Sequence, residues 1–257
     1  MNLTSILKKL EEVAPVALSN AFCKTYSMYD NSGILVDCGT EINGAVFSLD
    51  LTDEVLAEVE KLGYNLIVTH HPVIFGGIQH IYAGDLVAEC FRKGISVISM
   101  HLNFDAAPEG VDYHLMCGLG GNTAIKVLEP VEGGAYGRVY DIKPIVFGDY
   151  KKHVNKTFST DRALFYGDDN KIIKRVASFC GAGSGNSSIN FAKANGADVF
   201  VSSDMKHHEI TALLHNGINV IHLTHYSAES YGFNKIYLKI KDGLQIPSSF
   251  YFDKGLA

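Results

Sequence analysis

The stretch IVTHHPVIF, residues 67–75, joins an apolar run to two adjacent histidines and a proline. A continuous apolar run of this length is typical of a strand that is buried on both faces of a sheet. His70 and His71 then stand where this strand ends. Two imidazoles at such a place are either polar residues that end a strand or half of a metal site.

The segments on both sides of this strand predict an α/β fold. Residues 53–62 have the apolar spacing of a helix, with Thr52 as its N-cap and Gly63 at its end. A second helix over residues 86–93 and a second buried strand over residues 95–100 follow. This alternation implies right-handed crossovers and a largely parallel sheet.

The residues that follow these strands are the candidate site residues of the first half. Ligands of parallel sheets bind beyond the carboxyl ends of the strands. Four residues with side chains that can bind a metal fall there: His70, His71, His101 and Asp105.

The later part of the chain repeats this organisation. Strands are predicted over residues 176–180, 198–203 and 218–225, with helices from about residue 187 and over residues 207–216. The final apolar segment, residues 235–240, alternates like a half-exposed strand. The segments GISVISMH, residues 94–101, and GINVIHLTH, residues 217–225, are alike, and each ends in a histidine. We therefore predict two similar α/β halves with mixed, largely parallel sheets, at residues 1–130 and 175–257, and a connecting segment at residues 131–174.

The second half adds two further candidate ligands. His225 ends a strand and Glu229 follows four residues later, so a helix that begins near Ser227 places them one turn apart. With the first half, this makes three imidazoles and two carboxylates: His70, His71, Asp105, His225 and Glu229. Such mixed ligands suit zinc, iron or manganese, and two ions bridged by a carboxylate form a common hydrolytic site. The alternative is a set of ordinary polar residues at strand ends.

Two other motifs allow more than one interpretation. In SSDMKHHE, residues 202–209, His208 is a candidate proton shuttle, or else Asp204 caps a helix that carries exposed histidines. The loop GAGSG, residues 181–185, either binds a phosphate with its amides or simply makes a tight turn. It is not a Walker A loop, because no Gly-Lys-Ser/Thr follows it.

Composition narrows the class of protein. The net charge of −6 argues against general affinity for nucleic acid or anionic membrane. Residues 3–13 predict an amphipathic helix rather than a signal peptide, and no segment has the roughly 20 apolar residues of a membrane span. The five cysteines form no CxxC pair and fit a reducing compartment. We therefore expect a cytoplasmic protein.

These motifs together resemble one family. THHPVIF, HLNFD, the glycine loop after VASFC, SSDMKHHE and THYSAE occur in the order seen in the Nif-three-like proteins, also labelled GTP cyclohydrolase I type 2 homologs. YDNSG, residues 29–33, is similar to an early element of that family. The chain departs from the pattern of this family at Thr224, a position where many members have glycine.

The resemblance implies an arrangement and an activity. It implies a dinuclear metal site between the two halves, with the metal ligands at His70, His71, Asp105, His225 and Glu229, and a ring-shaped homohexamer. It also implies hydrolysis of GTP, in which a metal-activated water opens the guanine imidazole ring. In such a reaction His208 or His101 is our candidate for moving protons. Two alternatives remain: a hydrolase of another phosphoester or amide-like bond, and a metal-binding scaffold or chaperone without turnover.

Overall fold

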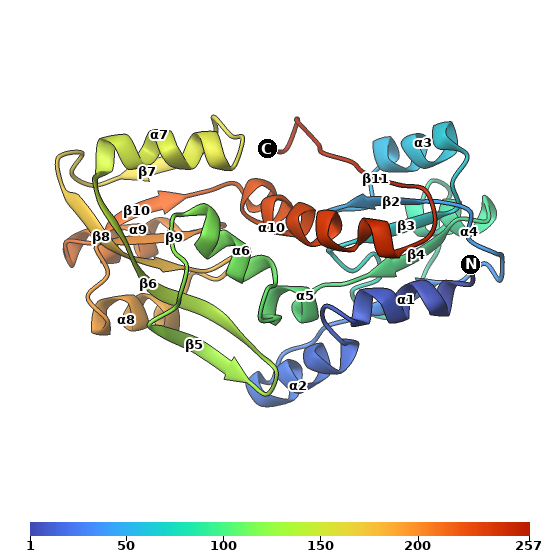
Figure 1. Cartoon of the computed structure of the whole chain (residues 1–257), viewed down its shortest axis with the longest axis horizontal. Helices are drawn as coiled ribbons and strands as arrows, with labels where there is room; N and C mark the ends of the chain where they lie inside the picture. Colours follow the sequence, from blue (N-terminus) through green and yellow to red (C-terminus); the bar gives the residue numbers. More distant parts are fainter. The chain divides into compact units, whose positions relative to one another are not determined.

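The computed structural model describes all 257 residues, which form two compact units, each built around its own β-sheet (Figure 1). Unit 1 contains residues 1–110, 131–133 and 233–252, and unit 2 contains residues 111–130, 134–232 and 253–257. This division differs from the one predicted from the sequence. The expected connecting segment lies almost wholly in unit 2, and the chain returns to unit 1 within helix α10 (His225–Ile240).

Unit 1 has a five-stranded mixed sheet in the order β1-β4-β3-β2-β11. Its strands are β1 (Gly33–Val36), β2 (Ala45–Ser48), β3 (Leu66–Thr69), β4 (Ser96–Ser99) and β11 (Ser248–Phe250). β11, β2, β3 and β4 run parallel, and β1 is antiparallel to β4. Because Thr69 pairs with Ser99, β3 and β4 end level, and the residues that follow both strands begin at one edge of the sheet.

Helices cover both faces of this sheet. They are α1 (Leu3–Glu11), α2 (Val16–Tyr26), α3 (Asp53–Leu62), α4 (Leu86–Arg92) and α5 (Leu102–Ala106), with the last two turns of α10. α3 and α4 pack on one face, where Val55 and Cys90 join a core with Ile67. Each fully buried large apolar side chain contributes roughly 1.5–3 kcal/mol. The predicted caps of α3 are confirmed, since Thr52 accepts a hydrogen bond from the Val55 amide and Gly63 has a φ of 68°.

Unit 2 has a six-stranded mixed sheet in the order β5-β6-β8-β9-β10-β7. Its strands are β5 (Lys126–Val131), β6 (Gly134–Val146), β7 (Leu164–Tyr166), β8 (Ile172–Ser178), β9 (Val199–Ser202) and β10 (Asn219–His222). Its helices are α6 (Val111–Gly118), α7 (Phe147–Thr157), α8 (Asn186–Ala194), α9 (His207–His215) and the start of α10. α8 and α9 bury Ile189 and Leu213 against Phe200 of β9. β8, β9 and β10 are parallel, so the predicted α/β class with mixed sheets is confirmed.

One predicted strand is a helix in the structure. Residues 235–240, KIYLKI, alternate like a strand when they are read alone, but they form the last turns of α10. Phe233, Ile236 and Tyr237 are buried, which is the i, i+3, i+4 spacing of a helix. Phe233 and Tyr237 pack on Phe47 of β2, with ring centroids 6.2 and 4.9 Å away. Contact with the sheet therefore overrides the short alternating pattern.

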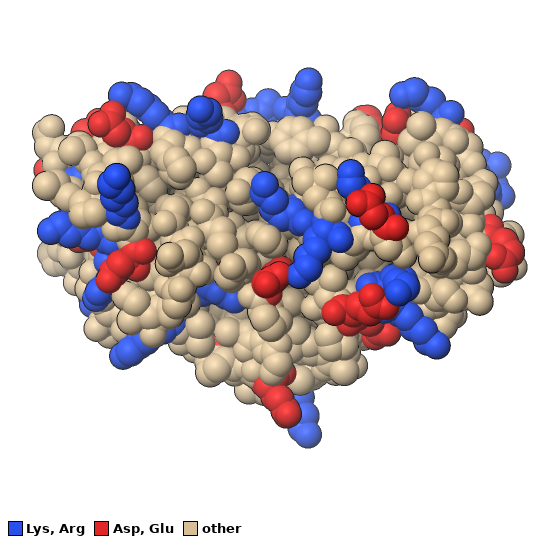
Figure 2. All heavy atoms as spheres, in the orientation of Figure 1, with Lys and Arg blue, Asp and Glu red and all other residues tan.

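The surface carries charges of both signs. Figure 2 shows basic and acidic side chains interspersed over the face displayed. Many are ion pairs, such as Lys61–Glu58 at 2.8 Å and Lys152–Asp149 at 2.9 Å. Exposed pairs of this kind contribute at most about 1 kcal/mol each to stability.

None of the helices combines the length and the apolar character needed to cross a membrane.

Candidate metal centre

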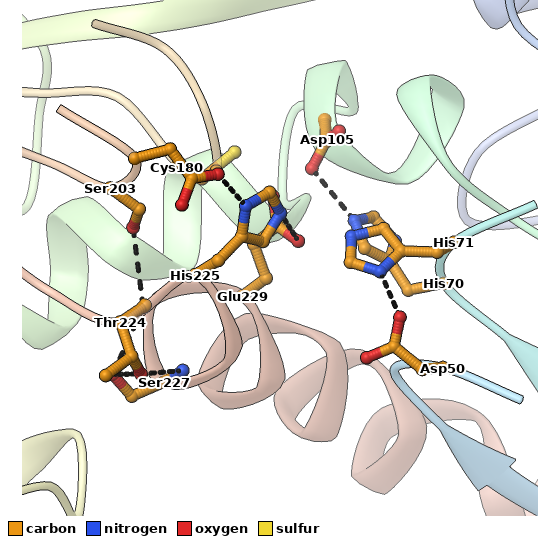
Figure 3. Close-up of polar contacts among 12 residues, drawn as sticks. Asp50, His70, His71, Asp105, Cys180, Ser203, Thr224, His225, Ser227 and Glu229 are labelled. Carbon is orange, nitrogen blue, oxygen red and sulfur yellow. Dashed lines mark hydrogen bonds and ion pairs between the residues drawn. The ribbon is translucent and has the colours of Figure 1, made fainter. Parts of the chain in front are cut away.

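In unit 1, three imidazoles meet at the carboxyl ends of β3 and β4. His70 and His71 follow β3 directly, and His101 is the second residue after β4. One ring nitrogen from each lies within 4.8 Å of the others, and the ring centroids are 5.2–5.7 Å apart. Asp105, on α5, places a carboxylate oxygen 3.3 Å from Nε2 of His70 (Figure 3). The sequence therefore predicted correctly that these four residues lie together.

Each of the three rings is held through its Nδ1 atom. His70 Nδ1 lies 2.8 Å from the Met100 carbonyl, His71 Nδ1 lies 2.6 Å from an Asp50 oxygen, and His101 Nδ1 lies 2.8 Å from an Asp30 oxygen. These oxygens can only accept a hydrogen bond, so Nδ1 is the donor and the lone pair is on Nε2. Histidines that bind metals are held in this way by carboxylates and carbonyls.

Asp30, which accepts the hydrogen bond from His101, is itself fixed by further hydrogen bonds. Its side chain is 1% exposed and accepts hydrogen bonds from Ser19, Ser32 and His101. Burial by itself raises the pKa of Asp30, but the three hydrogen bonds outweigh burial and hold it well below its usual value. Ser32 also accepts a hydrogen bond from the backbone amide of His101, at 3.0 Å. Asp30 therefore remains a carboxylate beside His101.

Unit 2 holds a second, smaller group. His225 is the first residue of α10 and Glu229 lies one turn later, with Nε2 and a carboxylate oxygen 3.0 Å apart (Figure 3). The predicted one-turn spacing is confirmed, although the helix begins two residues before Ser227. His225 Nδ1 lies 2.6 Å from an Asp204 oxygen. An imidazole and a carboxylate that converge on one point are donors that a divalent cation can satisfy together.

The glycine loop after β8 makes room for this pair. Gly181 has a φ of 55°, and a Cβ atom there would lie 2.2 Å from a Glu229 oxygen and 3.3 Å from Nε2 of His225. The preceding residue, Cys180, donates its amide to Asp112 at 3.2 Å, and Asp112 also pairs with Arg138 inside the unit. The loop is therefore a tight turn packed under the His225–Glu229 pair.

Some of these partners could not be found from the sequence. Asp30 belongs to YDNSG, residues 29–33, a segment that only the family resemblance distinguishes from the rest of the sequence. Asp50 had no distinguishing pattern beyond its place after β2.

His208, the predicted proton shuttle, lies exposed in the first turn of α9, and its imidazole makes no hydrogen bond, ion pair or ring contact. Its role in moving protons stays a prediction.

A cavity of about 1340 Å³ opens beside His71 and Asp50 in unit 1. Its walls are mainly apolar and come from β1, α4 and the segment between β3 and α4. Arg92 is its single lysine or arginine, and Arg92 is already paired with Glu89. The cavity has room for a nucleotide-sized molecule, and its lining suits a planar apolar ring better than a chain of phosphates.

Comparison with known proteins assigns the chain to a family. The model of the Duf34/NIF3 (NGG1p interacting factor 3) family matches residues 1–252. The chain belongs to this family. A GTP cyclohydrolase 1 type 2 homolog of Clostridium perfringens is 29% identical over 99% of this chain and 97% of its own length. A protein NIF3 homolog of Schizosaccharomyces pombe is 29% identical over 97% and 91% of the two chains.

Solved structures agree with the fold of this Duf34/NIF3 protein. A hypothetical protein of Staphylococcus aureus superposes with a TM-score of 0.83 at 24% identity, over 98% of this chain and 97% of that chain. Reduced HcgD from Methanocaldococcus jannaschii superposes with a TM-score of 0.80 at 25% identity, over 98% of each chain. Both structures therefore share the α/β fold of this chain.

Proposed function

We propose that this protein is a metal-dependent hydrolase. Two divalent ions, of zinc, iron or manganese, would be held by the five side chains His70, His71, Asp105, His225 and Glu229. The observation that carries the proposal is that three of these are histidines whose Nδ1 atoms are held by oxygen acceptors, which leaves the Nε2 lone pair for a metal. The candidate donors follow parallel strands, where α/β proteins bind ligands.

The residues have separable roles in this proposal. Bound metal ions would supply a nucleophile by lowering the pKa of water toward neutrality. Asp50 and Asp204 hold His71 and His225 in the tautomer that can bind metal. We assign proton transfer to His208, whose exposed position on α9 leaves it accessible to solvent.

GTP is the first substrate to test, by analogy with the relatives named GTP cyclohydrolase 1 type 2 homologs. The reaction would open the imidazole ring of guanine and release formate. The apolar cavity beside His71 supports a flat base as the bound group. Hydrolysis of another phosphoester or amide-like bond would use the same residues.

We also propose a homohexameric ring in the cytoplasm. The cytoplasmic location is supported by five free cysteines, which fit a reducing compartment. The hexamer rests on family resemblance. Light scattering of the purified protein tests it, and a monomer at working concentration would contradict it.

The deciding experiment combines elemental analysis with turnover. We expect about two ions per chain and a loss of GTP that a chelator abolishes. His70→Ala should lose metal and activity, while His215→Ala, an exposed histidine at the end of α9, should keep both. Two ions without turnover of GTP or of phosphoester and amide substrates would contradict the hydrolase and favour a metal-binding scaffold.

A further inference from the structure

We propose that the cavity beside His71 binds a planar nitrogen heterocycle that presents N–H donors and carries no phosphate, and that Asp37 recognises those donors. The proposed function, on which this inference rests for the identity of the ring, points to guanine. The bound molecule is then a guanine base or nucleoside rather than a nucleoside triphosphate. All residues that line the cavity belong to unit 1.

The walls of the cavity carry large apolar side chains that are left open to solvent. Ile78, Ile81 and Phe91 line the cavity and are 51%, 68% and 65% exposed. Phe91 lies on α4, and the two isoleucines lie in the segment between β3 and α4. Exposed apolar side chains gathered around a hollow mark a binding site, and an aromatic side chain among them offers a face on which a flat ring stacks. The walls therefore favour a planar ligand.

The polar groups of the cavity are mainly hydrogen-bond acceptors. Three carboxylates line it, those of Asp37, Asp50 and Asp85. One oxygen of each already accepts a hydrogen bond within the protein, and the other oxygen of each has no hydrogen bond. A carboxylate can only accept, so a molecule that satisfies these oxygens has to present N–H or O–H donors.

The same carboxylates oppose a chain of phosphates. Arg92 is the single lysine or arginine in the lining, and its guanidinium donates to both carboxylate oxygens of Glu89. A triphosphate would add several negative charges beside three carboxylates, and like charges brought together in a binding site repel. The cavity therefore favours an uncharged base or nucleoside over the corresponding nucleotide.

Asp37 is the carboxylate best placed to recognise the donors of the ring. Asp50 holds His71, and Asp85 holds a backbone amide of its own segment. Asp37 follows β1, is exposed, and accepts only the Gly39 amide, at 2.8 Å. Its two oxygens have about four lone-pair sites, so most of them are available. The N1–H and 2-amino groups of guanine are adjacent, and one carboxylate can accept from both.

The test is isothermal titration calorimetry of the full-length protein with guanosine, inosine and GTP. Guanosine should bind ~10-fold more tightly than inosine, which lacks the 2-amino donor, because a hydrogen bond to a charged acceptor is worth this much. GTP should bind at least ~10-fold more weakly than guanosine, because of charge repulsion. This comparison is made on wild-type protein and needs no variant.

Two variants test the named residues. Asp37→Asn should weaken guanosine binding by at least ~10-fold and remove the preference over inosine. Asp242→Asn, at an exposed aspartate of unit 1 outside the cavity and without a hydrogen bond, is its control. Phe91→Ala should weaken both nucleosides by ~10-fold through lost stacking. Leu238→Ala, at a 47% exposed position on α10, is the matched control and should bind as wild type does.

The outcomes separate this inference from the proposed function. GTP that binds as tightly as guanosine, absence of guanosine binding, or an unchanged preference for guanosine in Asp37→Asn would each overturn the inference. Guanosine binding by a protein that holds no metal would overturn the proposed function alone. Chelator-sensitive turnover of GTP, with GTP bound more tightly than guanosine, would support the proposed function and overturn the inference.

Discussion

Two segments of similar sequence, GISVISMH in unit 1 and GINVIHLTH in unit 2, each contain a strand that is followed by a histidine, and the two histidines are held very differently. Neither strand is at the edge of its sheet, and both histidines donate a hydrogen bond from Nδ1 to an aspartate, Asp30 for His101 and Asp204 for His225. The Asp30 side chain is 1% exposed, whereas that of Asp204 is 54% exposed. Similar local sequences therefore place a histidine beyond the carboxyl end of each strand. The burial of its aspartate partner, which differs between the two units, decides how firmly each histidine is held.

This contrast extends to the whole of each group. Unit 1 brings together three imidazoles and Asp105, with His70 fully buried. Unit 2 offers His225 and Glu229, and the His225 side chain is 32% exposed. We infer that the donors of unit 1 are held more firmly than those of unit 2.

The largest expected effect is on metal content when one histidine of each unit is removed. His70→Ala should weaken metal binding at least ~100-fold, because it deletes a buried donor from the tighter group. His225→Ala should weaken metal binding less, because the His225 side chain is 32% exposed. Elemental analysis after dialysis measures both. Equal loss of metal from the two variants would contradict the inference that the donors of unit 1 are held more firmly than those of unit 2.

A smaller effect is expected from filling the space under Glu229. In Gly181→Ala the new Cβ collides with the Glu229 carboxylate, so this variant should bind metal ~10–100-fold more weakly than wild type. Gly196→Ala is a matched control, since Gly196 also has a positive φ, of 66°, but nothing lies within 4 Å of a Cβ there. Both variants share a conformational cost of about 1–2 kcal/mol. Equal metal affinity in the two would show that the close approach is unimportant.

The aspartates that hold His101 and His225 provide another test of the difference between the two units. Asp30→Asn should weaken metal binding toward the ~100-fold end of the range for outer partners, and Asp204→Asn toward the ~10-fold end. The reason is that Asp30 is buried and makes three hydrogen bonds, while Asp204 is half exposed. Competition with a chelator measures both affinities. A larger effect for Asp204 would reverse the ranking of the units.

The smallest expected effect is on acid stability of the metal-free protein. Asp30 has a lower pKa in the folded protein than in the unfolded chain, so its stabilisation is complete above the unfolded value of ~4 and is lost as the pH falls through the folded value. Urea unfolding should therefore show Asp30→Asn to be less stable than wild type at pH 7, by on the order of 2 kcal/mol, with a difference that shrinks in acid.

The control for this measurement is Asp161→Asn, at an exposed carboxylate without a hydrogen bond. It should leave the unfolding free energy within about 0.5 kcal/mol of wild type at each pH. A pH-independent difference for Asp30→Asn would mean that the carboxylate is important for packing and not for its charge.

Much of this molecule was predictable from local patterns. β3 and β4, the helix α3 with its caps and the positions of His70, His71 and Asp105 follow from apolar runs and from the residues that end them. The one-turn spacing of His225 and Glu229 follows from helix geometry in the same way. Such features depend on neighbours in the chain, whose spacing is visible in the sequence.

What only the tertiary structure decided depends on residues far apart in the chain. Residues 131–174 joined the sheet of unit 2, and residues 235–240 became helical, because packing against a sheet outweighs a short pattern. Asp30 reaches His101 across 71 positions, and Asp50 reaches His71 across 21. The sequence by itself determined which residues end the strands. Folding determined which carboxylate holds each histidine, because those contacts form only when separate strands align at one edge of a sheet.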